Sequence, residues 1–151
     1  MEINFAPTTE ADRKFFINVH HTAYKDVITQ MFGWDEKLQD QFANKAFDEG
    51  GMHIVYNDEE KIGVVGWDVF PEYLWLKEIF ISPEYQGKGI GTKILQASQL
   101  KAQKLGKPLK LQTLKQNLGA KKLYQRFGFR VESETETHTK MILESAAAKG
   151  L

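Results

Sequence analysis

The sequence contains no cysteine, only four prolines and no excess of either charge. Without cysteine the chain has no disulfides, no thiolate ligands for zinc and no catalytic thiol. Its 20 basic and 20 acidic side chains cancel, which argues against a broad basic surface for nucleic acid or anionic lipid. No stretch approaches the roughly 20 apolar residues of a membrane-spanning helix, and the first residues do not resemble a signal peptide. We therefore expect a cytoplasmic protein without a nucleic-acid or membrane partner.

What the chain does have is the length and composition of an ordinary globular domain. Of its 151 residues, 42% are hydrophobic and 26% are charged, and a domain of this size builds a core without covalent cross-links. Residues 145–151 are small and featureless, which is typical of a frayed end or a cloning remnant. We predict a single domain over residues 1–144 and a flexible tail over 145–151.

Hydrophobic periodicity and turn residues predict alternating strands and helices. Strands are expected at about 1–6, 52–57, 62–70, 74–81, 109–114, 129–134 and 138–143, and helices at about 9–30, 35–49, 90–105 and 118–127. In the second helix, Leu38, Phe42 and Ala46 recur on the face expected to be buried. Hairpins mixed with strand–helix crossovers imply an α/β (α+β) fold, in which helices pack on a mixed sheet.

The segment with the clearest chemistry runs from a strand through a glycine-rich turn into a helix, over residues 79–92. Glycines at 87, 89 and 91 permit backbone conformations that other residues avoid and let a ligand approach the main chain. A helix N-terminus adds unpaired N–H groups and a positive dipole end, so a pyrophosphate is the natural ligand. The spacing matches neither the Walker A nor the dinucleotide-binding pattern. On the glycines alone, a simple strand-to-helix turn remains an open alternative.

Two motifs together resemble those of the GNAT superfamily of acyl-CoA-dependent N-acetyltransferases. The run 86–91 (Gln-x-x-Gly-x-Gly) resembles the family's pyrophosphate loop, and the run 117–129 (Asn-x-x-Ala-x-x-Leu-Tyr-x-x-Phe-Gly-Phe) resembles the second half of its cofactor site. The order of the expected strands and helices also resembles the family's fold, over residues 1 to about 143. The resemblance implies a mostly antiparallel central sheet with helices on both faces. It also implies a splay between the two central parallel strands, 74–81 and 109–114.

The resemblance further implies that acetyl-CoA is the co-substrate. Backbone groups at the end of strand 74–81 would pair with the pantetheine arm like an added strand, and the loop would bind the pyrophosphate. The cofactor-binding residues implied in this way are Ile79, Phe80, Ile81, Gln86, Gly87, Lys88, Gly89, Ile90, Gly91, Thr92, Asn117 and Tyr124. An N–H near Phe80 would also polarise the thioester carbonyl. Asn117 has a structural alternative as the cap of the fourth helix, and the two roles are compatible.

The family's reaction is direct transfer, in which an amine attacks the thioester through a tetrahedral intermediate. No acyl-enzyme is expected, because the chain has no cysteine and no serine in a nucleophile elbow. Tyr124 is the candidate general acid for the departing thiolate, and a core tyrosine is the alternative. Glu78 is the candidate base, since by strand alternation it shares the face of Phe80, where apolar neighbours are expected to raise its pKa. A rim carboxylate paired with a lysine, or proton loss from the amine through water, remains an alternative.

The acceptor amine has no sequence signature that names it. Tyr24, Trp34 and Glu78 are the expected substrate-binding residues, with His20 and His21 near them, and core packing is the alternative for each aromatic residue or histidine. No histidine spacing typical of a metal site is found, so no metal is expected. The sequence thus predicts an acetyl-CoA-dependent N-acetyltransferase for a small-molecule or peptide amine, as a monomer or homodimer. A non-catalytic CoA-binding regulatory module remains the alternative.

Overall fold

The computed structural model describes residues 2–144, which form two compact units. The first unit contains the described residues up to Gly66 together with Glu78–Ile90, and the second contains Trp67–Lys77 together with the described residues from Gly91 onward. The predicted single domain over 1–144 stays a prediction. The predicted tail, 145–151, lies outside the described residues.

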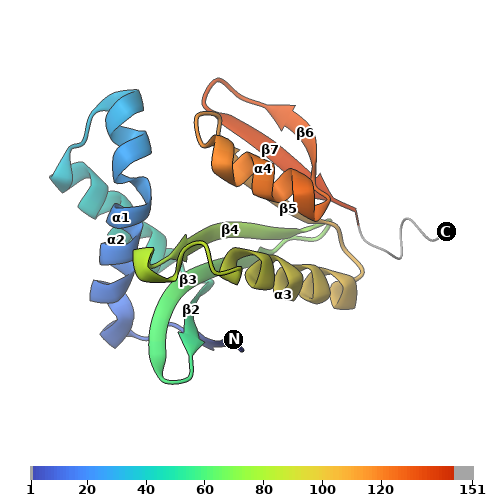
Figure 1. The fold of residues 1–151 in the computed structure, drawn as a ribbon, viewed down its shortest axis with the longest axis horizontal. Helices are drawn as coiled ribbons and strands as arrows, with labels where there is room; N and C mark the ends of the chain where they lie inside the picture. The colour runs from blue at the N-terminus through green and yellow to red at the C-terminus, as the bar shows by residue number, and fades with distance from the viewer. Residues whose placement is uncertain (1, 145–151) are drawn as a thin grey trace. The chain divides into compact units, whose positions relative to one another are not determined.

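Seven strands and four α-helices follow one another along the described chain (Figure 1). The strands are β1 (Asn4–Pro7), β2 (Met52–Asn57), β3 (Glu60–Val69), β4 (Leu74–Ile81), β5 (Leu109–Leu114), β6 (Arg130–Glu134) and β7 (His138–Leu143). The helices are α1 (Arg13–Phe32), α2 (Glu36–Glu49), α3 (Ile90–Leu105) and α4 (Leu118–Phe127), and short 3₁₀ helices span Glu10–Asp12 and Pro83–Tyr85. Every predicted element is therefore confirmed, with ends that move by at most a few residues. Within this described part, no helix has the length and apolar character needed to cross a membrane.

The sheet is mixed and mostly antiparallel, as predicted. Hydrogen-bonded neighbours follow the order β1-β2-β3-β4 in the first unit and β3-β4-β5-β7-β6 in the second, and β3 and β4 contribute a segment to each. The β1–β2, β2–β3, β5–β7 and β6–β7 ladders are antiparallel, whereas β4 and β5 are parallel. Their parallel ladder pairs Leu74 with Leu109 and Trp75 with Lys110, all within the second unit. The separation of the two strands beyond this ladder stays a prediction.

Helices α1 and α2 form the core of the first unit with strands β2, β3 and β4. The ring of Phe16 meets the rings of Phe47 and Phe80 edge-on, at centroid distances of 5.5 and 6.0 Å. The buried members of this core are Phe16, Val19, Ala43, Phe47, Met52, Ile54, Val64 and Phe80. Burying a large apolar side chain stabilises the folded state by about 1.5–3 kcal/mol, so this packing fixes the end of β4 against α1.

Helix α2 buries a different face from the predicted one. Leu38 and Phe42 are 41% and 51% exposed, whereas Ala43 and Phe47 are buried. The buried stripe is thus shifted by one position along the helix. Phe47 is the buried residue because it packs against α1. Its ring contacts the ring of Phe16, and the Arg13 guanidinium lies 4.5 Å from the centre of the same ring.

Candidate functional site

Glu78 lies near the end of β4 and faces the aromatic side chains of α1. The Tyr24 hydroxyl donates a hydrogen bond to Glu78 Oε2 at 3.0 Å, and both side chains are half-buried. The Tyr24 ring also meets the Phe80 ring edge-on at 5.3 Å. Glu78 and Phe80 therefore face the same helix, as strand alternation predicted. A half-buried carboxylate beside aromatic rings is suited to hold an ammonium group and to accept its proton.

The two adjacent histidines of α1 have different environments. His20 is buried, and its ring packs edge-on against Tyr24 and Phe80 at 5.1 and 5.7 Å. Burial, and secondly the neighbouring His21, lower the pKa of His20 to about 4, so this ring is neutral at pH 7. His20 is therefore a core residue, which confirms the plainer of its two interpretations. Its Nδ1 lies 3.0 Å from Nδ1 of His21, whose Nε2 lies 2.6 Å from Asp40 Oδ1.

Trp34 lies in the short turn between α1 and α2. Its ring meets His21 edge-on at 5.2 Å, and its Nε1 donates to Glu36 Oε2 at 2.5 Å. The Lys25 ammonium lies 5.7 Å from the centre of the Trp34 ring. The indole face is thus in contact with one cation of the chain itself, and the role of Trp34 toward a substrate stays a prediction.

The backbone of β4 is in close contact with β3. A Cβ atom on Gly63 of β3 would overlap the carbonyl oxygen of Phe80, and the N–H of Ser82 donates to Ile62 of β3 at 2.9 Å. Residues 80 and 82 therefore direct backbone groups to β3, and the alternation of a strand turns those of Ile79 and Ile81 to the opposite edge. Pairing of Ile79 and Ile81 with an added ligand stays a prediction, and the Phe80 carbonyl lies against β3.

The glycine-rich loop after β4 is open and leads directly into α3. Gly87 and Gly89 have φ angles of +74° and +80°, and a Cβ at either position would meet no atom within 4 Å. The Gln86 side chain donates to the Ile81 carbonyl at 3.0 Å, which ties the loop to the end of β4, and Ile90 is buried where α3 begins. This conformation leaves room for a diphosphate against the main chain, so the residues present fit acetyl-CoA.

The second unit contains Asn117 and Tyr124, the other two predicted site residues with side-chain roles. Asn117 Oδ1 accepts from the Ala120 N–H at 3.2 Å, so Asn117 caps α4 and its structural role is confirmed. Tyr124 is half-buried, and its ring centre lies 5.9 Å from that of Phe129. The roles of both residues toward acetyl-CoA stay predictions.

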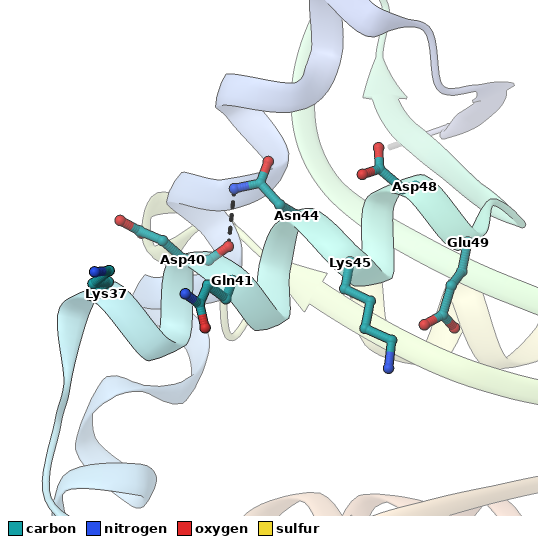
Figure 2. Close-up of a pocket in the computed structure, with 7 residues that line it drawn as sticks. All are labelled: Lys37, Asp40, Gln41, Asn44, Lys45, Asp48 and Glu49. Atoms are coloured by element: carbon teal, nitrogen blue, oxygen red, sulfur yellow. Dashed lines mark hydrogen bonds between the residues drawn. The ribbon is translucent and has the colours of Figure 1, made fainter.

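A hollow of about 640 Å³ lies along one side of α2 (Figure 2). The residues that line it are all polar or charged and come from one helix: Lys37, Asp40, Gln41, Asn44, Lys45, Asp48 and Glu49. The hollow contains Asp40 but no predicted site residue, so it is a separate surface feature.

His21, Glu36 and Asp40 form a group that the sequence did not indicate. One ligand atom from each lies within 4.8 Å of the others. Their separations along the chain match no metal or catalytic spacing, because the contact depends on how α1 and α2 pack. Only a correct model of that packing could have found them.

Comparison with known proteins agrees with the fold and with the family resemblance. Residues 14–129 match the model of the acetyltransferase (GNAT) family. The chain is 27% identical over 153 residues to the spermine/spermidine N(1)-acetyltransferase of Bacillus subtilis strain 168, covering 95% of this chain and 97% of that protein. It is equally similar to the probable spermine N(1)-acetyltransferase of Bacillus subtilis subsp. natto.

Solved structures of acetyltransferases share the fold. The PaiA N-acetyltransferase of Thermoplasma acidophilum, in complex with coenzyme A, is 18% identical with a TM-score of 0.77, covering 95% of this chain and 99% of that one. An acetyltransferase from Thermus thermophilus is 20% identical with a TM-score of 0.77, covering 95% and 97%. Since the family model spans most of the sequence and the strand order agrees, the chain belongs to the GNAT family of acetyltransferases.

Proposed function

We propose that the protein transfers the acetyl group of acetyl-CoA to a primary amine of a polyamine. The observation that carries the proposal is the Glu78–Tyr24 pair. It places a half-buried carboxylate on the strand that leads into the glycine-rich loop, within one unit. A base for an amine and a binding loop for a diphosphate thus belong to one short stretch of chain.

The main chain supplies most of the proposed binding of acetyl-CoA. The loop N–H groups from Gly87 to Gly89 and the first turn of α3, with Gly91 and Thr92, would bind the diphosphate. Ile79 and Ile81 would pair with the pantetheine amides, because their backbone groups face away from β3. Asn117 would add a hydrogen bond to pantetheine while it caps α4. Gln86 supports the arrangement through its bond to the Ile81 carbonyl.

The proposed reaction forms one bond, breaks one bond and moves two protons. The amine nitrogen bonds to the thioester carbonyl carbon, and the resulting tetrahedral intermediate breaks its C–S bond. The neutral amine loses one proton to Glu78, directly or through one water, as it becomes the amide, and the thiolate takes a proton from the Tyr124 hydroxyl. Proton exchange with solvent then returns Glu78 to the carboxylate and Tyr124 to the phenol. No residue is acylated, since the chain contains no cysteine.

The charge and aromatic character of the first unit favour a polyamine acceptor. A polyamine carries several ammonium groups at neutral pH, and Glu78 offers a carboxylate beside the Tyr24 and Phe80 rings. Trp34 offers a further ring that already contacts the Lys25 ammonium. The curated relatives named for spermine and spermidine match over nearly the whole chain, which supports the same class.

A thiol-release assay tests the proposal. Acetyl-CoA is supplied with spermine, spermidine, a simple alkylamine or a lysine peptide, and the products are identified by mass spectrometry. We expect thiol release that depends on the amine and is fastest with a polyamine, together with an acetylated polyamine. Faster acetylation of the peptide would overturn the acceptor class. Binding of acetyl-CoA without thiol release for any amine would instead favour a non-catalytic CoA-binding module.

A further inference from the structure

Three side chains outside the Glu78 site combine an imidazole with two carboxylates. His21 is on α1, whereas Glu36 and Asp40 are one turn apart on α2, so both point from the same side of that helix. One ligand atom from each lies within 4.8 Å of the others. We infer that His21, Glu36 and Asp40 form a binding site for a divalent transition-metal ion of the zinc class.

The distances are close to those of a ligand set. Zinc bonds of about 2.0–2.2 Å place the ligand atoms of a tetrahedral site about 3.3–3.6 Å apart. His21 Nε2 lies 3.8 Å from Glu36 Oε1 and 2.6 Å from Asp40 Oδ1. The required adjustments are about 1 Å or less for these two pairs. The two carboxylates can move that far, because their side chains are 64% and 48% exposed.

Neighbouring groups orient two of the three ligands. His21 Nδ1 is hydrogen-bonded to His20 Nδ1 at 3.0 Å, and this leaves Nε2 directed at the carboxylates. The Trp34 indole N–H donates to Glu36 Oε2 at 2.5 Å, while Oε1 is the atom nearer His21. Support of this kind, from the second nitrogen of a histidine and the second oxygen of a carboxylate, is typical of metal sites.

The donor set indicates the class of ion. One imidazole nitrogen favours zinc, cobalt or nickel over magnesium and calcium, which prefer all-oxygen sites. Two carboxylates neutralise a dication, and a fourth position would take water. The ion would bind the His21 tautomer whose ring proton is on Nδ1, toward His20 Nδ1, and whose Nε2 carries none. Asp40 also lines the open hollow of Figure 2, which gives the ion a path from solvent.

Cobalt(II) titration of the whole protein, prepared without a histidine tag and stripped with chelator, tests the inference. We expect one Co²⁺ per chain, with the visible bands of a four- or five-coordinate ion, and displacement of Co²⁺ by Zn²⁺. Asp40→Asn and Glu36→Gln should each weaken Co²⁺ binding by about tenfold or more. Because the ion joins α1 to α2, Zn²⁺ should also raise the melting temperature of the wild type.

Glu49→Gln is the matched control, since Glu49 is an exposed carboxylate of α2 outside the cluster. It should bind Co²⁺ and respond to Zn²⁺ as the wild type does. A Co²⁺ spectrum that stays octahedral, or equal affinity in the wild type and both cluster variants, would show an ordinary His21–Asp40 hydrogen bond and overturn the site. Equal stabilisation by Mg²⁺ would overturn the assigned class. Circular dichroism checks the fold, and if one variant fails to fold the other decides.

Discussion

The proposal that Glu78 is the general base can be tested with a substitution that changes little besides its charge. Glu78→Gln keeps an oxygen to accept the Tyr24 hydrogen bond but removes the basic group. We expect kcat to fall on the order of 100-fold near pH 7, because general base catalysis typically contributes 10²–10⁴-fold. The loss should shrink at high pH, where more of the amine arrives neutral. Steady-state rates over a pH series measure both effects.

Tyr24→Phe separates the positioning of Glu78 from its chemistry. The variant removes the hydroxyl that holds Oε2 but leaves the carboxylate. Its kcat should fall less than that of Glu78→Gln, and its pH–rate profile should shift, which a merely structural role would not produce. If Glu78→Gln has wild-type kcat at every pH, proton loss through water is the mechanism.

Tyr124→Phe tests the general acid. Loss of the hydroxyl should lower kcat on the order of 100-fold and leave the affinity for acetyl-CoA nearly unchanged, because the ring still packs against Phe129. Turnover is measured by thiol release and affinity by calorimetry. Tyr73→Phe is the control, since Tyr73 stacks on Phe70 and has no role in the proposed reaction. Equal turnover in the wild type and Tyr124→Phe would remove Tyr124 from the mechanism.

At this scale, sequence reasoning finds residues whose role follows from local chain geometry. The Asn117 cap and the shared face of Glu78 and Phe80 could be predicted, because caps and strand alternation depend on near neighbours. The contact of His21 with Asp40 could not, because it depends on how α1 and α2 pack. The proton state of His20 depends in the same way on burial among distant residues.

At the scale of secondary-structure elements, substitutions in the loop between β4 and α3 test whether this loop binds the diphosphate of acetyl-CoA. Gly89→Asn and Gly89→Asp introduce side chains of equal size that tolerate positive φ, so they differ in charge alone. Gly89→Asp should bind acetyl-CoA at least about fivefold more weakly than Gly89→Asn, since a like charge near a phosphate costs about 1 kcal/mol or more.

Calorimetry at two salt concentrations measures the difference, which should narrow at high salt as charges are screened. Equal affinity of the two variants would show that the diphosphate does not lie against this loop.

The close packing of β3 against β4 affects the stretch of β4 that is proposed to pair with pantetheine. Gly63→Ala places a methyl group against the Phe80 carbonyl, a backbone atom that cannot rotate away. We expect a loss of about 1–3 kcal/mol in the free energy of unfolding and a higher KM for acetyl-CoA, because the shift reaches Ile79 and Ile81. Gly119→Ala on α4 is the control for stability, since its methyl would meet only Asn117 Oδ1 at 4.0 Å. Urea unfolding and initial rates give the two readouts, and unchanged values for Gly63→Ala would contradict this account.

Helix α2 shows where element-level prediction from sequence fails. Its length and ends could be predicted from the Asp35 cap and from Gly50, which are local signals. The predicted buried face was wrong by one position along the helix. Phe42 and Phe47 are equally hydrophobic, and it is the packing of Phe16 of α1 against Phe47 that buries Phe47 and leaves Phe42 exposed. Periodicity therefore predicts that a helix exists more securely than it predicts which side is buried.

For the whole molecule, a net charge of zero is compatible with an anionic co-substrate. The proposed diphosphate site draws on main-chain N–H groups of an open loop and on one helix N-terminus, so it needs no excess of basic side chains. The mixed character of the sheet could be predicted, because hairpins and strand–helix crossovers restrict topology. The parallel β4–β5 pair was expected from the family resemblance alone. The close approach of Gly63 to the Phe80 carbonyl could not be predicted, because it depends on the pairing register of β3 with β4.

Asp12 forms hydrogen bonds with residues that lie far apart along the chain in the first unit, and its ionisation makes the free energy of unfolding depend on pH. Its carboxylate accepts from the Thr9 N–H at 2.8 Å and from Lys61 Nζ at 2.6 Å. Burial alone would raise the pKa of Asp12, but the hydrogen bonds from Lys61 and Thr9 outweigh it and hold this pKa below its ordinary value of 3.8. The charged carboxylate therefore stabilises the fold above pH 3.8, and the contribution is lost as the pH falls through the lower folded-state pKa.

Asp12→Asn should lower the free energy of unfolding by about 1–3 kcal/mol at pH 7, because it leaves Lys61 without its anionic partner. The difference from the wild type should narrow as the pH falls below 3.8, as urea unfolding at pH 7 and pH 3 would measure. Glu144→Gln breaks the more exposed Arg130 pair and should cost about 0.5 kcal/mol or less. A cost for Asp12→Asn that stays constant between pH 7 and pH 3 would show that shape, rather than charge, makes Asp12 stabilising.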